Sequence, residues 1–387
     1  MMSPANPHVL IAGLTTRPFA ASAARAGYRV TAVDGFGDRD LRECAEVISP
    51  RFESGQNYDP GAAAQAAASV PAYLAAYTSN FENYPAAVTR LAQGRRLLGN
   101  PASTLTRIRN PIELMHVLRR FGLPLAETRS RAPGASSPRV SWLLKPRRSG
   151  GGHGIQRWSS GQPVPRSMYL QERIPGVPGS ASFIANGSSA VLLGLSRQLV
   201  GEADFGAGPY RYCGSLMAGR GTPLFPGHAE LLQRAAKMAT LLTREFRLVG
   251  LNGLDFIARR GIPYVTEVNP RYSSSMELIE RSTGVSMFEA HIRACSGTLE
   301  VELSPEATVH GKAVVFARRD IEISKLPEQS GAGWIADVPQ PGERISQGRP
   351  ICTVFAEART AEACRQKLGA RAAAVYRCLG ARVGQAA

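Results

Sequence analysis

Cysteine is sparse in this sequence, and no pattern joins the few that occur. Six cysteines are scattered over 387 residues, and none forms a C-x-x-C pair with another. Zinc ribbons and dithiol redox sites need such spacing, so the sequence predicts neither. We expect reduced and mostly buried thiols. They are Cys44, Cys213, Cys295, Cys352, Cys364 and Cys378.

Long apolar runs are also missing. No hydrophobic stretch approaches the roughly 20 residues that a membrane-spanning helix needs. Residues 1–7 carry neither a basic segment nor a long apolar one. We therefore expect a cytoplasmic protein with no membrane partner. The content of 44% hydrophobic and 20% charged residues indicates a globular chain that is long enough for two or three subdomains.

Lysine is scarce, because only five of the 46 basic residues are lysine and the others are arginine. A formal charge of +16 would suit a nucleic-acid partner. The positive charge is spread along the chain, however, and no aromatic-basic cluster of a known binding module occurs. We do not expect a nucleic-acid partner, and an anionic substrate such as ATP accounts for part of the charge.

Two nucleotide-binding fingerprints are absent. Residues 8–12 predict a strand, 17–26 a helix and 28–34 a second strand, and this βαβ unit opens a parallel sheet. The first turn does not read G-x-G-x-x-G, so a nicotinamide site is not predicted, although Asp34 ends the second strand. A Walker pattern, which ends in G-K-[ST], is missing as well.

A polar loop, Ser79–Pro85, follows the next predicted strand, which lies near residues 73–78 after an alanine-rich helix. Open α/β sheets place their ligands at this carboxyl edge. Glu82 is therefore a candidate for substrate contact, and a helix N-cap is the alternative role. Residues 85–98 predict a helix that stops at Gly99.

A glycine-rich loop follows the predicted strand 140–146, which carries Lys145. Four glycines within five positions leave backbone N–H groups free to approach phosphate oxygens, and the lysine adds a compact positive charge. A flexible hairpin connection is the alternative, but a rare lysine directly before the glycines favours phosphate binding. His153 lies in this loop, and we expect it to contact phosphate or solvent rather than to move protons. The glycines are Gly150, Gly151, Gly152 and Gly154.

A predicted β-hairpin, with strands at 250–257 and 264–271, carries the densest set of polar side chains. Because side chains alternate along a strand, an acid, an amide and an arginine share one face, and an acid of the partner strand can join them. Hard oxygen ligands of this kind suit Mg²⁺ that carries nucleotide phosphates. The alternative is the solvated face of an edge hairpin. The residues are Asp255, Glu267, Asn269 and Arg271.

The remaining elements alternate between short strands and helices. Helices are predicted at 108–121, 228–246, 276–283, 288–295 and 361–379, and strands at 167–176, 181–184, 190–195, 311–317 and 351–355. The segment 210–214 is predicted to be a loop. The fold class is therefore α/β.

In this order, the motifs resemble those of the ATP-grasp superfamily, in the branch of carboxylate-amine ligases and biotin-carboxylase-like enzymes. The resemblance covers most of the chain and includes Gln171-Glu172 as a hinge strand and Gly348–Ile351 as part of a closing segment. It implies a Rossmann-like parallel-sheet domain at 1–100, an ATP-grasp domain of two α+β subdomains at 101–300 and a small C-terminal segment at 301–387. Within the second domain, 101–165 would bear the lid and 166–300 the metal site.

The resemblance also implies roles for individual residues. Lys145 would contact the ATP phosphates, and Arg271 would steady the transferring phosphoryl group or the acyl phosphate. The glycine loop with His153 would close over the phosphates, and backbone groups of Gln171, Glu172, Arg173 and Ile174 would bind adenine. One or two Mg²⁺ (or Mn²⁺) ions would be held by Asp255, Glu267 and Asn269. Substrate-side candidates are Glu82, Arg197 and Tyr212.

Two departures from the family pattern leave roles open. Many relatives have a second lysine near the start of the grasp domain, and here Arg107, Arg109 or Asn110 occupies that place. An acidic residue often follows the hinge to hold ribose, and here the chain has Gly176–Ser180 instead.

The resemblance implies an ATP-dependent ligase that activates a carboxylate as an acyl phosphate and joins it to an amine, with small-molecule substrates and a homodimer as the expected assembly. Ligation of an amino acid such as glutamate in one-carbon cofactor biosynthesis is one version of this reaction. The alternatives are a carboxylase-like enzyme that activates bicarbonate, a basic nucleic-acid-binding protein, and an ATP sensor without turnover.

Overall fold

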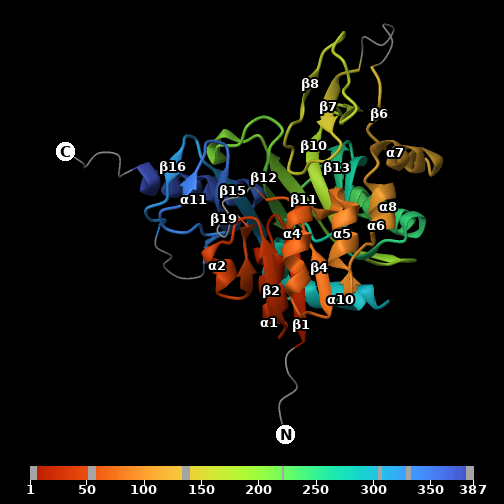
Figure 1. Ribbon diagram of the computed structural model, residues 1–387. Coiled ribbons are helices and arrows are strands. Elements are labelled where there is room, and N and C mark those ends of the chain that lie inside the picture. The colour runs from red at the N-terminus through yellow and green to blue at the C-terminus, as the bar shows by residue number, and fades with distance from the viewer. Residues whose placement is uncertain are drawn as a thin grey trace.

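The computed structural model describes residues 7–50, 58–132, 140–219, 222–303, 307–327 and 333–380. Three main sheets organise this part of the chain (Figure 1). Within it, no helix is long and apolar enough to cross a membrane. The mixed α/β class is as predicted.

The first sheet is parallel throughout and has the order β3-β2-β1-β4-β5. Its central strands are mainly apolar and mostly buried, as expected for strands covered on both faces. The strands are β1 (His8–Gly13), β2 (Arg29–Asp34), β3 (Glu46–Ile48), β4 (Leu74–Tyr77) and β5 (Arg96–Leu98), with α1 (Arg17–Arg25), α2 (Arg39–Arg42), α4 (Pro60–Ala66), η1 (Ala67–Ser69), η2 (Phe81–Asn83) and α5 (Pro85–Leu91) between them.

Two predicted helices are wrong in extent. The helix predicted at 85–98 ends at Leu91, and 96–98 form β5 beside β4, because Gly94 adopts a positive φ of 68° that turns the chain back to the sheet. The helix predicted at 108–121 corresponds to α7 (Pro111–Arg120), which starts later than predicted and follows a separate helix, α6 (Ala102–Ile108). Asn110 has the extended conformation imposed on a residue before proline, and it caps α7 instead of continuing α6.

The second sheet is small and antiparallel, with the order β6-β9-β7-β8. It projects at the top of the molecule in Figure 1 and carries the glycine-rich loop between β7 and β8. Its strands are β6 (Thr128–Arg129), β7 (Trp142–Pro146), β8 (Gln156–Trp158) and β9 (Met168–Glu172).

The third sheet has eight antiparallel strands in the order β14-β13-β10-β11-β12-β15-β19-β17. They are β10 (Val177–Asn186), β11 (Ala190–Val200), β12 (Tyr212–Ala218), β13 (Val249–Arg259), β14 (Ile262–Asn269), β15 (Val309–Phe316), β17 (Ile335–Ala336) and β19 (Pro350–Ala358). The loop predicted at 210–214 is therefore partly strand, because β12 begins at Tyr212. Since β15 pairs with β12, the segment predicted to close the chain continues the sheet of the preceding domain.

Helices cover both faces of the large sheet. Phe183 packs in the core with α8 (His228–Phe246), and the next residue, Ile184, packs on the other face with α10 (Met287–Cys295). Alternation places Asp255 on the Ile184 face, because Leu251 of the same strand belongs to that core. The remaining elements are α9 (Met276–Thr283), α11 (Ala361–Gly380), η3 (Ala203–Phe205), β16 (Ile321–Glu322) and β18 (Arg344–Ile345).

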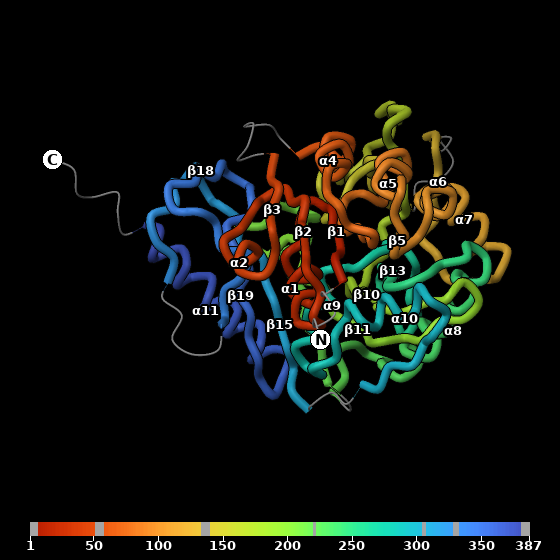
Figure 2. The backbone as a smooth tube through the Cα atoms, turned by 60° about the horizontal axis from the view of Figure 1, so that its bottom comes forward, coloured from red at the N-terminus to blue at the C-terminus, as the bar shows by residue number. Residues whose placement is uncertain are grey.

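The parallel-sheet domain lies against this same face of the large sheet. The Asn100 side chain donates to the carbonyl of Pro270 at 3.0 Å, and Arg17 Nη1 lies 2.5 Å from Glu277 Oε1 in α9. In Figure 2 the red α2 lies beside the blue C-terminal strands, where Asp40 accepts hydrogen bonds from the backbone of Asp337 and Val338. The carboxyl edge of the parallel sheet is thus brought to the polar face of the predicted metal hairpin.

Candidate active site

The β13–β14 hairpin brings the three predicted metal ligands together. Asp255 is paired directly with Glu267, and Asn269 is paired with Gly253, two residues along the same face. Asn269 Nδ2 donates to Asp255 Oδ2 at 2.9 Å, and Gln198 Nε2 donates to Oδ1 of the same carboxylate at 3.1 Å. The two carboxylates and the amide therefore form one polar patch on adjacent strands.

This donor set fits a Mg²⁺ ion that also binds phosphate. The part of the chain that the structure describes contains no group of three or more His, Cys, Asp or Glu side chains arranged to hold a metal. Two carboxylates are what Mg²⁺ commonly takes from a protein, because it keeps several waters and completes its shell with substrate phosphates. The set is too small for an all-protein metal cage, and it suits a metal that arrives with a nucleotide.

The pKa values of the two carboxylates are shifted in opposite directions. Burial and the nearby charge of Glu267 raise the pKa of Asp255 to about 6. Burial would also raise the pKa of Glu267, but Arg109 and Lys145 outweigh it and bring that pKa below its ordinary value. Two adjacent carboxylates repel each other when both are ionised. A cation bound between them would therefore favour the ionised form of Asp255 and lower its pKa.

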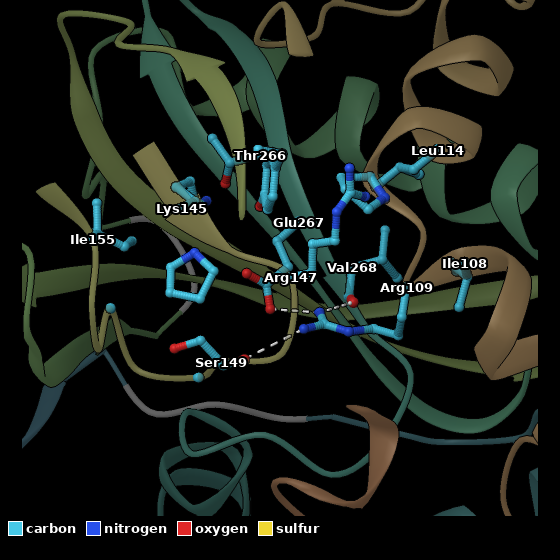
Figure 3. Close-up of a pocket in the computed structure, with 15 residues that line it drawn as sticks. Ile108, Arg109, Leu114, Lys145, Arg147, Ser149, Ile155, Thr266, Glu267 and Val268 are labelled. Carbon is cyan, nitrogen blue, oxygen red and sulfur yellow. Dashed lines mark hydrogen bonds and ion pairs between the residues drawn. The ribbon is translucent and has the colours of Figure 1, made fainter. Parts of the chain in front are cut away.

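Arg109 is a site residue that the sequence left among three alternatives. Its Nη1 atom lies 2.5 Å from Glu267 Oε1 and 3.0 Å from the carbonyl oxygen of Val268 (Figure 3). Arg107 instead pairs with two half-buried acids, Glu113 and Glu245. Since Asn110 caps α7, Arg109 is the residue that presents a positive charge to the hairpin from the start of the grasp domain.

Arg271 and Glu82 form an ion pair between the hairpin and the parallel-sheet domain. The Nε and Nη2 atoms of Arg271 lie 3.0 and 2.9 Å from the same oxygen, Oε1 of Glu82. Arg271 Nη2 also donates to Asn269 Oδ1 at 3.3 Å. The next residue after Glu82, Asn83, accepts from Arg109 at 2.8 Å. The turn after β4 therefore places Glu82 against Arg271 and Asn83 against Arg109. These two arginines flank the predicted metal ligands.

Lys145 lies in the cavity between the small sheet and the hairpin. Its Nζ atom donates to Gln171 Oε1 at 2.9 Å and lies 5.8 Å from the ring centre of Tyr169. Gln171 in turn donates to the carbonyl of Thr266 at 3.0 Å, so one amide links the two sheets behind the lysine. Figure 3 shows Lys145, Arg109, Arg147 and Glu267 lining this cavity, and the glycines of the loop that line it are Gly150 and Gly152.

The glycine-rich loop is docked on β12. The Tyr212 N–H donates to the Gly151 carbonyl at 3.0 Å. Gly152 has φ of +76°, and a Cβ atom at this position would lie 1.8 Å from the Tyr210 carbonyl oxygen, so only glycine allows this approach. Burial and the charges of Arg211 and Arg349 lower the pKa of His153, which favours a neutral ring.

Two backbone N–H groups of the predicted hinge already donate hydrogen bonds within the protein. The N–H of Glu172 donates to the Glu127 carbonyl at 2.7 Å, and the N–H of Arg173 donates to the Ser141 carbonyl at 2.8 Å. These two donors are used within the protein, so the adenine contact predicted for Glu172, Arg173 and Ile174 stays a prediction.

The two other substrate-side candidates differ in position. Tyr212 is close to the site, because its Oη atom lies 2.9 Å from Ser215 Oγ, and Ser215 is paired with Gln198, the residue bound to Asp255. Arg197 precedes Gln198 and so points to the opposite face of β11, where it is exposed. The structure thus does not bring Arg197 to this patch.

Sequence reasoning missed Gln198, Asn83 and Ser149, which contact the predicted residues. Ser149 offers its carbonyl to Arg109 at 3.5 Å and to the Asn83 amide at 3.2 Å. Asn83 follows Glu82 in the loop that was predicted to meet ligand, and that position was the available signal. No signal in the sequence pointed to Gln198, because its contact with Asp255 depends on the pairing of β10 with both β11 and β13.

The fold thus combines a parallel-sheet domain, a small sheet with the glycine-rich loop, and a larger antiparallel sheet on which Asp255 and Glu267 are paired. Residues 109–275 match the family model of the ATP-grasp domain. This part of the chain is therefore similar to an ATP-grasp domain.

Solved structures share this fold over nearly the whole chain. The biotin carboxylase domain of Hydrogenobacter thermophilus 2-oxoglutarate carboxylase, solved as a dimer with MgADP, ADP and bicarbonate, matches with a TM-score of 0.71 at 14% identity, covering 93% of this chain and 88% of that one. N5-carboxyaminoimidazole ribonucleotide synthetase of Thermus thermophilus gives 0.68 at 17% identity, with coverage of 95% and 98%. The L-amino acid ligase of Bacillus licheniformis gives 0.67 at 16% identity, with coverage of 95% and 97%.

Two curated proteins also match the sequence. An uncharacterized protein of Methanocaldococcus jannaschii is 23% identical over 372 residues, which are 91% of this chain and 88% of that protein. The large chain of carbamoyl phosphate synthase from Myxococcus xanthus is 28% identical over 184 residues, which are 45% of this chain but 16% of that protein. The latter match therefore concerns a part of a much longer enzyme.

Proposed function

We propose that the protein is an ATP-dependent ligase that phosphorylates a substrate carboxylate and joins the resulting acyl phosphate to an amine, with release of ADP and phosphate. The observation that supports this best is the patch formed by Asp255, Glu267 and Asn269, with Arg109, Arg271 and Lys145 around it. Such a site acts by positioning and charge neutralisation, without a protein nucleophile.

Each residue has a physical role in this proposal. Lys145 lies beside the glycine-rich loop and would neutralise phosphate charge, while Gln171 fixes its ammonium group. Asp255, Glu267 and Asn269 would hold Mg²⁺ or Mn²⁺, which supplies the positive charge that bridges phosphate oxygens when bound. The guanidinium groups of Arg109 and Arg271 would stabilise charge that develops on the transferring phosphoryl group and on the acyl phosphate.

The narrower parts of the proposal concern substrate and setting. Ligation of glutamate or another amino acid to a one-carbon cofactor precursor, in the cytoplasm and by a homodimer, is one version of this reaction. Bicarbonate activation is the closest alternative. The same phosphate-binding and metal-binding residues would serve that reaction, and a biotin carboxylase domain shares the fold. The choice depends on which carboxylate and which acceptor the protein accepts.

The test is phosphate release from Mg-ATP by the purified protein, screened across pools of amino acids, amines, polyamines and bicarbonate. We expect release that depends on one carboxylate and one amine together, and that Glu267→Gln abolishes. The matched control is Glu300→Gln at an exposed position, which should leave the rate unchanged. Release with bicarbonate and no other carboxylate would favour the carboxylase alternative. Tight ATP binding without release in any pool would contradict the ligase and favour an ATP sensor.

A further inference from the structure

Two buried side chains of the parallel-sheet domain hold the backbone beside Arg271. Asn100, which follows β5, is fully buried, and Tyr77, the last residue of β4, is 3% exposed. The Asn100 Nδ2 atom donates to the carbonyl oxygen of Pro270 at 3.0 Å, and the Tyr77 hydroxyl lies 3.3 Å from the same oxygen. Pro270 separates Asn269, a predicted metal ligand, from Arg271. The two side chains therefore contact the backbone of the candidate active site.

The peptide unit between Pro270 and Arg271 is held at both of its polar groups. Its carbonyl oxygen accepts from Asn100, and its N–H group, which belongs to Arg271, donates to the carbonyl oxygen of Asn269 at 2.8 Å. Because a peptide unit is planar, fixing its C=O and N–H groups fixes the direction in which it meets the Arg271 Cα atom. The proline ring also restricts φ at position 270. The point from which the Arg271 side chain starts is thus set by these contacts.

Asn100 is itself held by β13 and by Tyr77. Its Oδ1 atom accepts from the Val249 N–H at 2.9 Å, and its Nδ2 atom also donates to Asn252 Oδ1 at 2.9 Å. The Tyr77 hydroxyl donates to the backbone carbonyl of Asn100 at 2.8 Å. The Tyr77 ring packs closely on Gly99, because a Cβ atom at that glycine would lie 3.2 Å from the ring. One amide therefore links both strands of the β13–β14 hairpin to the parallel-sheet domain.

The orientation of the Arg271 side chain decides where its charge lies. The side chain is 11% exposed, and its guanidinium group donates to Glu82 Oε1 and to the carbonyl of Tyr272, each at 2.9 Å. In the proposed ligase this group stabilises charge on the transferring phosphoryl group, which requires donors that are already in place. A displacement of about 1 Å can cost about a hundredfold in rate. Support of the backbone beside Arg271 therefore bears on catalysis.

We infer that Asn100 is a positioning residue, which sets the place of the Arg271 guanidinium through the Pro270 carbonyl, and that Tyr77 supports Asn100 in this role. Both act through the backbone and not through contact with a ligand. The inference rests on the proposed function for the role of Arg271, whereas the hydrogen bonds that carry it do not depend on any reaction. The alternative is that the two side chains only join the domains, and the two roles predict different measurements.

The first measurement is the Nε–H resonance of Arg271, observed by NMR of the full chain without ligand and assigned by its absence in Arg271→Lys. This group donates to Glu82 at 3.0 Å, so it should exchange slowly with water. We expect Tyr77→Phe and Asn100→Ala to shift the resonance and to accelerate its exchange about tenfold or more. No change in either variant overturns the inference. Where Asn100→Ala does not fold, Tyr77→Phe decides alone, because it removes a single oxygen atom.

Two variants control for the loss of a hydrogen bond elsewhere. Tyr376→Phe removes a hydroxyl that donates to a backbone carbonyl at 2.9 Å, and Asn186→Ala removes an amide that donates to a backbone carbonyl at 2.9 Å. Both should lower the unfolding temperature by a few degrees, as Tyr77→Phe should, without altering the Arg271 resonance. An equal change of that resonance in the controls would show a general effect of lost hydrogen bonds and would refute positioning.

Turnover distinguishes a failure of this inference from a failure of the proposed function. Where substrate-dependent phosphate release is observed, Tyr77→Phe should lower kcat about threefold to tenfold with the KM for ATP unchanged, and Asn100→Ala should lower kcat about a hundredfold. Neither change should lower kcat further in an Arg271→Ala background, because the group to be positioned is then missing. Full additivity with Arg271→Ala would contradict positioning and retain the ligase. A displaced Arg271 resonance without phosphate release from any pool would contradict the ligase and retain positioning.

Discussion

Arg109 and Glu267 lie in contact, 2.5 Å apart between Nη1 and Oε1, although 158 residues separate them along the chain. The pair joins the start of the region that matches the ATP-grasp domain to the predicted metal hairpin, and it favours the ionised form of Glu267. Arg271 and Glu82 make the equivalent contact from the parallel-sheet domain. The proposed reaction centre is thus bordered by ion pairs between distant parts of the chain.

Arg109→Ala should reduce kcat/KM by about 10²–10³-fold, because it removes a preorganised positive charge from the phosphate region. It should also destabilise the protein by about 1–3 kcal/mol, because the half-buried Glu267 would be left without its partner. Steady-state kinetics and thermal unfolding measure the two effects. Arg107→Ala is the matched control, since that arginine is exposed and pairs outside the site, and equal losses in both variants would contradict the assignment.

Binding of Mg-ATP should weaken as the pH falls below about 6. Asp255 has a pKa of about 6 in the folded protein, above its ordinary value of 3.8, and a metal requires its ionised form. Affinity should therefore decrease about tenfold per pH unit below that value. Calorimetric titration between pH 5 and 8 measures this decrease, and a flat profile would contradict it.

Asp255→Asn should raise the unfolding temperature of the metal-free protein at neutral pH by a few degrees. The raised pKa means that the protonated acid stabilises the fold at low pH, and this contribution is lost as the pH rises through about 6. Asparagine imitates the protonated acid at every pH. Thermal unfolding at pH 5 and 8 should therefore show a larger gain at pH 8 than at pH 5, and an equal gain at both would refute the titration of Asp255 as its cause.

Lys145→Met should weaken ATP binding by about tenfold to a hundredfold, because the side chain keeps its length but loses the charge beside the phosphates. Nucleotide titration measures the loss. Lys237→Met on the exposed face of α8 tests whether net charge alone is responsible. If both variants lose affinity equally, the general positive charge of the protein, and not this lysine, attracts ATP.

Gly152→Ala should prevent the glycine-rich loop from docking on β12, because the new Cβ atom would collide with the Tyr210 carbonyl. The KM for ATP should rise about tenfold or more, and limited proteolysis should cut the loop faster. Gly161→Ala has a similar positive φ of 88° with no atom near its Cβ position. It separates backbone strain from the collision, and similar behaviour of the two variants would show that docking is not the cause.

The sequence by itself determined the local elements. Helix α8 was predicted at the bounds that the structure has, 228–246, because its apolar period is strong and glycine precedes it. The β13–β14 hairpin was predicted with its acids on one face, since alternation along a strand is fixed by backbone geometry. The glycine-rich loop after Lys145 was found because glycine clusters and a rare lysine are visible without any contact between distant residues.

Only the tertiary structure decided which charges meet. Spacing could not distinguish Arg107 from Arg109, because the break between α6 and α7 sets their directions. Arg197 was predicted to contact substrate. Its neighbour Gln198 is the residue on the face of β11 that meets Asp255. Glu82 meets Arg271 across 189 residues, and this contact depends on how the parallel-sheet domain packs on the large sheet. Such pairings follow from non-local burial and charge, which no local pattern of the chain encodes.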